Sequence, residues 1–379
     1  MPTPSTSTDY QARIIRDTDT LRAIQQALMD TYFQDCDPEH FTTAQGKTDL
    51  EANVAARYNK ALTHIVPWVA NTTPLGTKRL VEIGCGTGSS TAAFSHFVEK
   101  VDGYDIDAGS IEAARARFSI MNISNADVHL VSAEDCISTV QKNHPDGIDI
   151  LLLYAVLEHQ TIAERHETIT GCWNLLNDDG LLIIADTPNL LCYHDHHTSL
   201  LPFLHLLPAD LYAQYARFSP RKNFGCGFDG YQDLSTRTLE LAITRLGRGI
   251  SYHDFDLALG KDYKNHLICN GFEKEILDSV QVTFEEELLR SFIERHTLDI
   301  PAAFSRVVLN FILKKGDPPP HPLPPPPANS FFVPMDQYKA CEERNHQLQT
   351  TLAQMRHSKR WKLGSLLAAP YRALKRYGR

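Results

Sequence analysis

Four histidines have neighbours that suit proton transfer, and each stands where a predicted strand or loop ends: His159, His196, His197 and His253. Asp195 directly precedes His196, and Asp254 directly follows His253, so these two regions each offer a His/Asp pair. A histidine titrates near neutral pH, and a carboxylate can orient its ring, so such a pair can take the proton from a hydroxyl group. The four histidines are therefore candidate catalytic bases.

Each candidate has a structural alternative that the residue types leave open. His159 could order the start of the helix that follows it, and His253 could lie on a solvated strand edge. His194, His196 and His197 with Asp195 could bind a divalent metal ion. Consecutive histidines project in different directions, however, so we predict no metal here.

A glycine turn lies upstream of these groups. Residues 80–83 form a short apolar strand, glycines follow at 84, 86 and 88, and residues 91–98 have helical periodicity. A strand that leads through glycines into a helix gathers backbone N–H groups at one point, which suits a nucleotide-like ligand. Dinucleotide-binding turns have G-x-G-x-x-G spacing, but Ser89 occupies the last of those positions, which argues against an NAD-dependent oxidoreductase.

Two carboxylates accompany the turn. Glu82 lies inside the apolar strand, so we expect it to meet a cation or N–H donors at the strand end. Asp105 ends the second predicted strand, residues 100–106, about 20 residues after Gly84, where an acid typically binds a ribose. Asp107 precedes the next helix and is predicted to be its N-cap.

The order E-x-G-x-G-x-G, from Glu82 to Gly88, resembles motif I of class I S-adenosylmethionine-dependent methyltransferases. Leu157-Glu158-His159 after the fourth strand and the region "LLNDDGLLIIADTPN" also resemble that superfamily, so the likeness extends over residues 80–189. It implies S-adenosylmethionine as cofactor, with Asp105 on the ribose hydroxyls and His159 beside the methyl group. It also favours His196 or His197 as the base, since they follow strand five. The cofactor residues that it implies are Glu82, Gly84, Gly86, Gly88, Asp105, Ala133 and Glu134.

Residues 79–315 alternate between strand and helix, which predicts an α/β fold: a Rossmann-like, seven-stranded, mostly parallel sheet with helices on both faces. The remaining segments are additions to it. They are an N-terminal helical cap (1–78), an acceptor-side insertion (190–305), a solvated proline-rich linker (316–334), and a coiled-coil-like helix with a basic amphipathic tail (335–379).

Composition limits the possible partners. The chain has 379 residues and a net charge of −9, yet residues 356–379 carry eight Lys/Arg and no acid. An acidic body argues against nucleic acid binding, and a basic tail suggests an acidic partner of its own. Eight scattered cysteines without C-x-x-C spacing, no apolar leader and no apolar run of about 18 residues predict a cytoplasmic protein.

The segment "SKRWKLGSLLAAPYRALKR" resembles tails of bacterial glycosyltransferases and methyltransferases that build surface polysaccharides. It implies contact with the inner face of the plasma membrane or with a glycan-assembly complex through 356–379; a disordered solubilising tail is the alternative. Residues 335–355 suggest a homo-oligomer through a short coiled coil.

The sequence thus predicts methyl transfer from S-adenosylmethionine to a sugar hydroxyl of a bacterial surface glycan or its precursor. Two alternatives stay open. The acceptor could be another small molecule or a lipid-linked one, or the chain could be an inactive cofactor-binding subunit that recruits partners.

Overall fold

The computed structural model describes residues 7–222, 224–317, 322–327, 343–351 and 353. The chain divides into two compact units, Met1–Pro327 and Ala328–Arg379. In the second unit residues 343–351 are helical and exposed. The rest of the predicted coiled coil and the whole tail, 356–379, lie outside the described residues, so the oligomer and tail predictions stay predictions.

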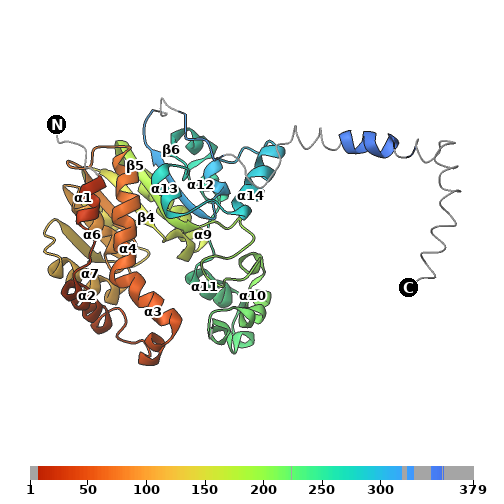
Figure 1. Ribbon diagram of the computed structural model, residues 1–379. Coiled ribbons are helices and arrows are strands. Elements are labelled where there is room, and N and C mark those ends of the chain that lie inside the picture. The colour runs from red at the N-terminus through yellow and green to blue at the C-terminus, as the bar shows by residue number, and fades with distance from the viewer. Residues whose placement is uncertain (1–6, 223, 318–321, 328–342, 352, 354–379) are drawn as a thin grey trace, which may run out of the picture. The chain divides into compact units, whose positions relative to one another are not determined.

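A seven-stranded sheet forms the centre of the first unit (Figure 1), with strand order β3-β2-β1-β4-β5-β7-β6. The strands are β1 (Arg79–Ile83), β2 (Lys100–Asp105), β3 (Ala126–Leu130), β4 (Ile148–Tyr154), β5 (Leu176–Pro188), β6 (Leu267–Cys269) and β7 (Val308–Lys314). The first five strands pair in parallel, and β7 is antiparallel to both β5 and β6. The predicted mostly parallel, Rossmann-like sheet is confirmed.

Helices cover both faces of the sheet because its central strands are apolar on both sides. Ile150 and Leu152 of β4 face one core, and Leu151 and Leu153 face the other. The first core contains α6 (Ser89–Ser95), α7 (Ala108–Ile120) and α13 (Lys274–Ser279) together with the N-terminal helices. The second contains α8 (Cys136–Asn143), α9 (Ile162–Leu175) and α12 (Tyr252–Leu259). α14 (Phe284–Arg295) lies near η10 (Ala302–Ser305), and η9 (Lys261–His266) precedes β6.

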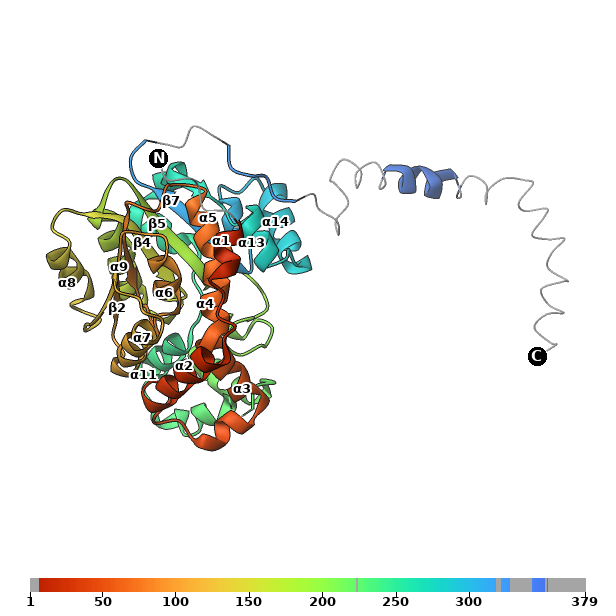
Figure 2. The same cartoon turned by 60° about the vertical axis from the view of Figure 1, so that its left-hand side comes forward.

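The predicted N-terminal helices are present and pack on the sheet (Figure 2). Two π-helical segments flank α4, so the helix from 44 to 70 alternates between α and π geometry. Arg57 and Lys60 reach a cavity from it, while Tyr58 and Leu62 are fully buried on its opposite side. The elements are α1 (Ser7–Ala12), α2 (Thr18–Asp30), η1 (Pro38–Thr42), α3 (Ala44–Glu51), η2 (Ala52–Ala56), α4 (Arg57–Lys60), η3 (Ala61–Ile65) and α5 (Val66–Ala70).

The range 190–305, predicted as an insertion, contains strand β6 of the central sheet and the helices that pack beside it. Only its first part forms a separate layer, with a small core of its own around Tyr212, Phe228 and Ile243. That layer consists of η5 (Leu204–Leu206), α10 (Ala209–Tyr215), η6 (Ala216–Phe218), η7 (Phe224–Phe228), η8 (Tyr231–Asp233) and α11 (Thr236–Leu246).

Part of the proline-rich linker packs against the first unit, contrary to the predicted solvated spacer. The carbonyl of Pro324 accepts a hydrogen bond from the Asn270 amide at 2.9 Å, and that of Pro327 accepts one from Arg290 at 2.8 Å. Leu323 adds an apolar contact to the second core. Proline carbonyls remain good acceptors, so a proline-rich segment can dock where side-chain donors are available.

Within the described part of the chain, every helix is too short or too polar to span a bilayer.

Candidate active site

A cavity of about 990 Å³ opens where β1, β2 and β4 end. The glycine turn forms one wall, α3 and α4 form another, and α11 contributes Arg245 and Leu246. Both views of the fold place α3 and α11 at the same end of the molecule (Figures 1 and 2). This is the edge of a parallel sheet at which ligands typically bind.

The glycine turn needs its glycines for two different reasons. Gly84 has φ +73°, and a Cβ there would lie 2.2 Å from a methyl of Val156. Gly86 has φ +51°, and a Cβ there would meet nothing within 4 Å, because this position faces the cavity. Gly88 has φ +72° and packs against Ala114 of α7. Two of the three predicted glycines thus line the cavity, and Gly88 shapes the turn behind it.

Glu82 does not meet the cation or the N–H donors that the sequence suggested. Its carboxylate is fully buried and accepts hydrogen bonds from the hydroxyls of Ser90 and of Thr91, the latter at 2.5 Å. Burial raises its pKa to about 7. Both hydroxyls belong to the first turn of α6, so Glu82 ties the strand to the helix that follows the glycine turn and does not line the cavity.

Asp105 lies at the cavity, at the end of β2, as predicted. Its two carboxylate oxygens accept from the backbone N–H of Gly86 at 2.7 Å and of Asp107 at 2.9 Å. Asp107 itself caps α7 by accepting from the N–H of Ser110, which confirms its predicted structural role. Ala133 and Glu134 line the same cavity beyond β3. Asp105, Ala133 and Glu134 therefore share one cavity wall, and their binding of a cofactor stays a prediction.

His159 and His197 meet at the other end of the cavity. Their ring centroids are 5.7 Å apart. Burial lowers the pKa of both imidazoles, that of His197 to about 4, so both rings are neutral at pH 7. Two of the four predicted histidines are thus brought together at the cavity.

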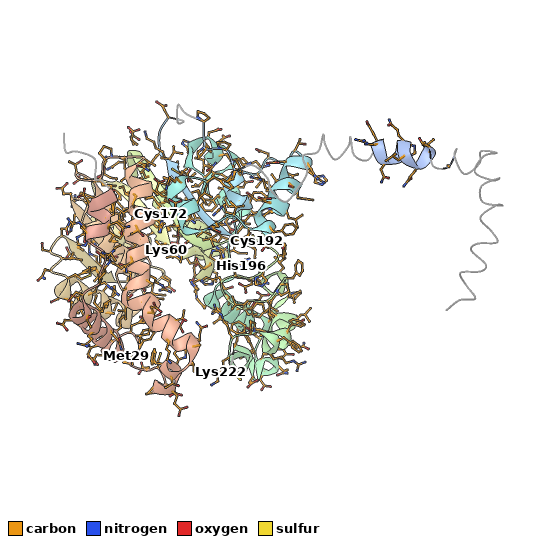
Figure 3. The ribbon with its side chains drawn as sticks, viewed as in Figure 1. Met29, Lys60, Cys172, Cys192, His196 and Lys222 are labelled. Atoms are coloured by element: carbon orange, nitrogen blue, oxygen red, sulfur yellow. The ribbon has the colours of Figure 1, made fainter. Side chains whose placement is uncertain are left out.

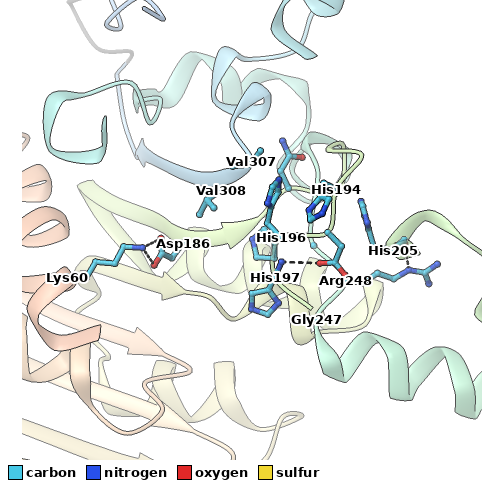
Figure 4. A pocket seen from close by; sticks show the side chains of 14 residues that line it. Lys60, Asp186, His194, His196, His197, His205, Gly247, Arg248, Val307 and Val308 are labelled. Carbon is cyan, nitrogen blue, oxygen red and sulfur yellow. Dashed lines mark hydrogen bonds and ion pairs between the residues drawn. The ribbon is translucent and has the colours of Figure 1, made fainter. Parts of the chain in front are cut away.

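The other two histidines lie elsewhere. His196 accompanies Lys60 and Asp186 in a second cavity of about 190 Å³ (Figure 4), where its Nε2 lies 3.0 Å from Glu285. The Glu285 carboxylate raises the pKa of His196. His253 lies within α12, stacked on Tyr252 with ring centroids 3.9 Å apart, and is absent from both cavity walls.

The predicted His/Asp pairs do not form, because the carboxylates of both aspartates accept hydrogen bonds from backbone N–H groups. Asp195 accepts from the N–H groups of His197, Thr198 and Ser199. Asp254 belongs to the capping box of α12 and accepts from Arg165 at 2.9 Å. Each carboxylate thus fixes a chain turn or a helix start, and its neighbouring histidine is oriented by another group.

Three cavity residues escaped the sequence prediction. Lys60 Nζ lies 2.7 and 2.5 Å from the two carboxylate oxygens of Asp186, and the Tyr154 hydroxyl donates to Asp186 at 2.9 Å. Lys60 comes from α4, among the N-terminal helices (Figure 3). Tyr154 comes from the end of β4, and Asp186 from the end of β5. Asp186 could have been predicted, because it lies near the end of a strand, where site residues are typical. No neighbouring residue in the sequence indicates a role for Lys60.

Glu158 also lies behind the histidines, fully buried. Burial raises its pKa to about 8. Neither of its carboxylate oxygens has a hydrogen-bond partner among the described residues. The positive charge of Arg165 lowers the pKa of Glu158 somewhat, but Arg165 makes no hydrogen bond to it. Its guanidinium donates to the carbonyls of Leu157 and Gln160 and to the carboxylate of Asp254.

Part of the chain that forms this site is similar to a known type of domain. Residues 81–182 match the family described as "Methyltransferase domain". The chain is 28% identical over 118 residues to a ubiquinone biosynthesis O-methyltransferase of Thiobacillus denitrificans, covering 31% of this chain and 48% of that protein. It is 32% identical over 108 residues to the Glaesserella parasuis protein of the same name, covering 28% and 44%. The chain thus spans about half the length of the curated relatives that it matches.

Solved structures give weaker likenesses. A phosphoethanolamine N-methyltransferase of Haemonchus contortus with S-adenosylhomocysteine has TM-score 0.30 and 17% identity, over 48% of this chain and 34% of that one. An amino pentose methyltransferase of Micromonospora echinaspora with bound S-adenosylmethionine has TM-score 0.30 and 16% identity, over 38% and 56%. The matched segment 81–182 itself extends from β1 into β5 and includes the glycine turn. The predicted resemblance to a methyltransferase domain is confirmed for residues 81–182.

Proposed function

We propose that the protein is an S-adenosylmethionine-dependent O-methyltransferase whose acceptor is a hydroxyl of a sugar in a bacterial surface glycan or its precursor. One observation carries the proposal: a single cavity has the glycine turn and Asp105 on one wall and the imidazoles of His159 and His197 on another. A cofactor and an acceptor can therefore occupy it together.

The reaction requires alignment more than new chemistry from the protein. A lone pair of the acceptor oxygen forms the new bond to the methyl carbon. The carbon–sulfur bond breaks, and sulfur keeps its electron pair as the thioether of S-adenosylhomocysteine. The hydroxyl proton leaves, so the products are the methyl ether and one proton. The cavity supplies orientation, and His159 and His197 supply groups that activate the hydroxyl.

A polar acceptor fits the lining. Three cations, Arg57, Lys60 and Arg221, and the carboxylate of Asp186 line the cavity. Beyond the bonds that they already make, such charged groups have donor and acceptor positions that suit the hydroxyls of a sugar better than an apolar chain, which would displace water from them without replacing its hydrogen bonds. The printed name of the curated relatives supports oxygen as the atom that receives the methyl group.

A second candidate acceptor is a hydroxylated small molecule outside glycan synthesis. The name of the relatives, ubiquinone biosynthesis O-methyltransferase, favours it, since a quinone precursor carries ring hydroxyls. The two candidates share the cofactor and the reaction and differ only in what occupies the acceptor end.

The test has two stages. Calorimetry with S-adenosylhomocysteine and with NAD comes first, and binding of NAD alone would overturn the proposal. Methyl-labelled S-adenosylmethionine is then supplied with extracted surface glycan, nucleotide sugars or hydroxylated aromatics. Label in the sugars supports the glycan acceptor, and label only in the aromatics supports the second candidate. Cofactor binding without any transfer would indicate an inactive subunit.

The tail suggests where this reaction takes place. Its eight Lys/Arg interleave with Trp361, Leu366 and Tyr371, a composition that suits the anionic inner face of the plasma membrane or a glycan-assembly partner. We extend the proposal to a cytoplasmic enzyme that docks peripherally through 356–379.

A further inference from the structure

Three metal-ligand side chains converge at the acceptor end of the cavity. Glu158 and His159 are adjacent in η4 (Leu157–His159), and His197 comes from the loop after β5. Glu158 Oε1 lies 3.9 Å from Nε2 of His159 and 3.9 Å from Nε2 of His197. The three ligand atoms all lie within 4.8 Å of one another.

The carboxylate of Glu158 lacks the partners that a buried charge requires. Its side chain is 0% exposed, and both oxygens are without a hydrogen bond among the described residues. Removing a carboxylate from water costs several kcal/mol unless a cation or donors compensate. Both distances to the histidines are too long for hydrogen bonds, which fall near 3 Å. A cation between the three groups would satisfy both oxygens, which the described residues leave without a partner.

Both histidines direct a bare nitrogen toward that space. Nδ1 of His159 lies 2.9 Å from the carbonyl of Arg245, which can only accept, so this nitrogen carries the ring proton. Nδ1 of His197 lies 2.9 Å from the Thr198 hydroxyl, which donates onward to the Gly247 carbonyl. The neutral ring then has its lone pair on Nε2 in both cases. Metal-binding histidines are oriented in the same way by an acceptor at the other ring nitrogen.

The backbone is shaped to hold the two rings in this position. Gly247 has φ +103°, and a Cβ there would lie 2.9 Å from His197 Cε1 and 3.1 Å from His159 Cε1. The side chains of His159 and His197 are 39% and 35% exposed and line the large cavity. An ion held by the three groups would thus have open positions that face the acceptor.

We propose that Glu158, His159 and His197 bind a divalent transition-metal ion, of which zinc is the best match to two imidazoles and one carboxylate. Catalytic zinc sites commonly have three protein ligands of these types and keep one position open. Manganese and iron suit mixed nitrogen and oxygen ligands as well, whereas magnesium and calcium prefer oxygen alone. This site replaces the metal-free expectation from the sequence and differs from the His194–His197 cluster considered there.

The role of the ion rests on the proposed function. The acceptor hydroxyl occupies the open position, and the positive charge makes its proton more acidic. The proton leaves to solvent, and the oxygen, still bound to the metal, attacks the methyl carbon. The carbon–sulfur bond then breaks with its electron pair on sulfur. The ion returns unchanged, so no oxidant or reductant is consumed.

The test measures metal binding separately from turnover. The full chain is stripped with a chelator, and Zn²⁺, Mn²⁺ or Mg²⁺ is titrated in by calorimetry. We expect one equivalent of Zn²⁺, bound at least 100-fold more weakly by Glu158→Gln and by His197→Ala. His346→Gln, in the exposed helix 343–351, is the matched control and binds as the wild type. Co²⁺ supplies a second readout, since its visible absorption reports the number and the geometry of its ligands.

The outcomes separate this inference from the proposed function. Equal Zn²⁺ affinity in wild type and both variants, or less than one equivalent in the wild type, overturns the metal site. The Glu158→Gln protein removes an unpaired carboxylate, so its fold is expected to persist, and S-adenosylhomocysteine binding within threefold of wild type verifies that. One tightly bound ion without methyl transfer to any acceptor supports the site and overturns the proposed function. Full turnover by the stripped protein overturns the role of the ion.

Discussion

Lys60 Nζ lies 2.7 and 2.5 Å from the two carboxylate oxygens of Asp186, joining the N-terminal helices to the end of β5. The pair is 126 residues apart in the chain and lines both cavities. The N-terminal segment is therefore part of the site as well as a cover over the sheet.

Removing the amine from this pair should affect turnover more than cofactor binding. Lys60→Met leaves a half-buried carboxylate in the cavity wall without its cation. If the proposed methyl transfer takes place there, we expect kcat to fall at least tenfold, about 1.4 kcal/mol in the barrier. S-adenosylhomocysteine affinity, measured by calorimetry, should stay within threefold. Lys47→Met, on the exposed side of α3, is the control and should match the wild type in both measurements.

The two glycines at the turn should fail in different ways. Gly84→Ala places a methyl against Val156 at positive φ, and we expect about 2 kcal/mol or more of lost stability in thermal unfolding. Gly86→Ala meets open space, so its stability loss is limited to about 1 kcal/mol of backbone strain. Its methyl faces the cavity, however, where we place the cofactor, and should weaken S-adenosylhomocysteine binding at least tenfold. Equal thermal stability of the two variants would contradict this assignment.

Glu82 should make the fold less stable as pH rises. Its folded pKa of about 7 lies above the ordinary value of 4.5, so the folded chain binds this proton more tightly than the unfolded chain does. Stability is therefore lost between about pH 4.5 and pH 7. Urea unfolding at pH 5 and pH 8 should show the wild type losing up to about 3 kcal/mol more than Glu82→Gln. Parallel pH profiles of the two proteins would refute the buried acid.

The His196–Glu285 pair also loses its stabilisation as pH rises, but over a higher pH range than Glu82, because histidine has a higher ordinary pKa than glutamate. Glu285 raises the pKa of His196, so this stabilisation is fully present below the unfolded histidine pKa and is lost as pH rises through the folded one. Urea unfolding should therefore find His196→Gln less stable than wild type near pH 6 and similar to it near pH 9. The same substitution in a Glu285→Gln background should have little effect at either pH. Turnover should change less than about threefold, since this ring is committed to Glu285.

The basic tail should confer salt-sensitive membrane binding. In flotation with vesicles rich in phosphatidylglycerol, the full chain should rise with the lipid at low salt and separate from it at high salt, because screening weakens attraction between exposed charges. A chain without residues 356–379 should remain with the soluble fraction. Neutral phosphatidylcholine vesicles serve as the control, and equal flotation of both chains with anionic vesicles would exclude the tail as the anchor.

Local patterns predicted the half of the cavity to which we assign the cofactor, because that half is built from neighbouring residues. The glycine turn, Asp105 and the strand ends follow one another in the chain, and parallel strands bring their carboxyl ends to one edge. The partners of Glu82 were missed, since the hydroxyls of Ser90 and Thr91 depend on how α6 docks against β1.

The acceptor half could not be predicted in the same way, because distant segments assemble it. His159 is oriented by the carbonyl of Arg245, 86 residues away, and Lys60 meets Asp186 across the sheet. Asp195 and Asp254 have the right sequence neighbours, yet the local backbone N–H groups of a turn and a helix start bind their carboxylates first. Adjacency in sequence indicated a His/Asp pair, whereas folding placed the histidines and aspartates in separate hydrogen-bond networks.

The two π-helical segments that flank α4 make the length of this helix a determinant of the site. A π turn accommodates one residue more than an α turn, so each segment behaves as a single-residue insertion within a continuous helix. Deleting one residue from 52–56 would restore α geometry and rotate the preceding helix by about 100° relative to Arg57 and Lys60. Thr48 and Asp49 would then turn away from the cavity while their sequence stayed intact. Inserting or deleting one residue here would change which side chains line the cavity. Such a change is a route to new acceptors that needs no substitution among the cavity residues themselves.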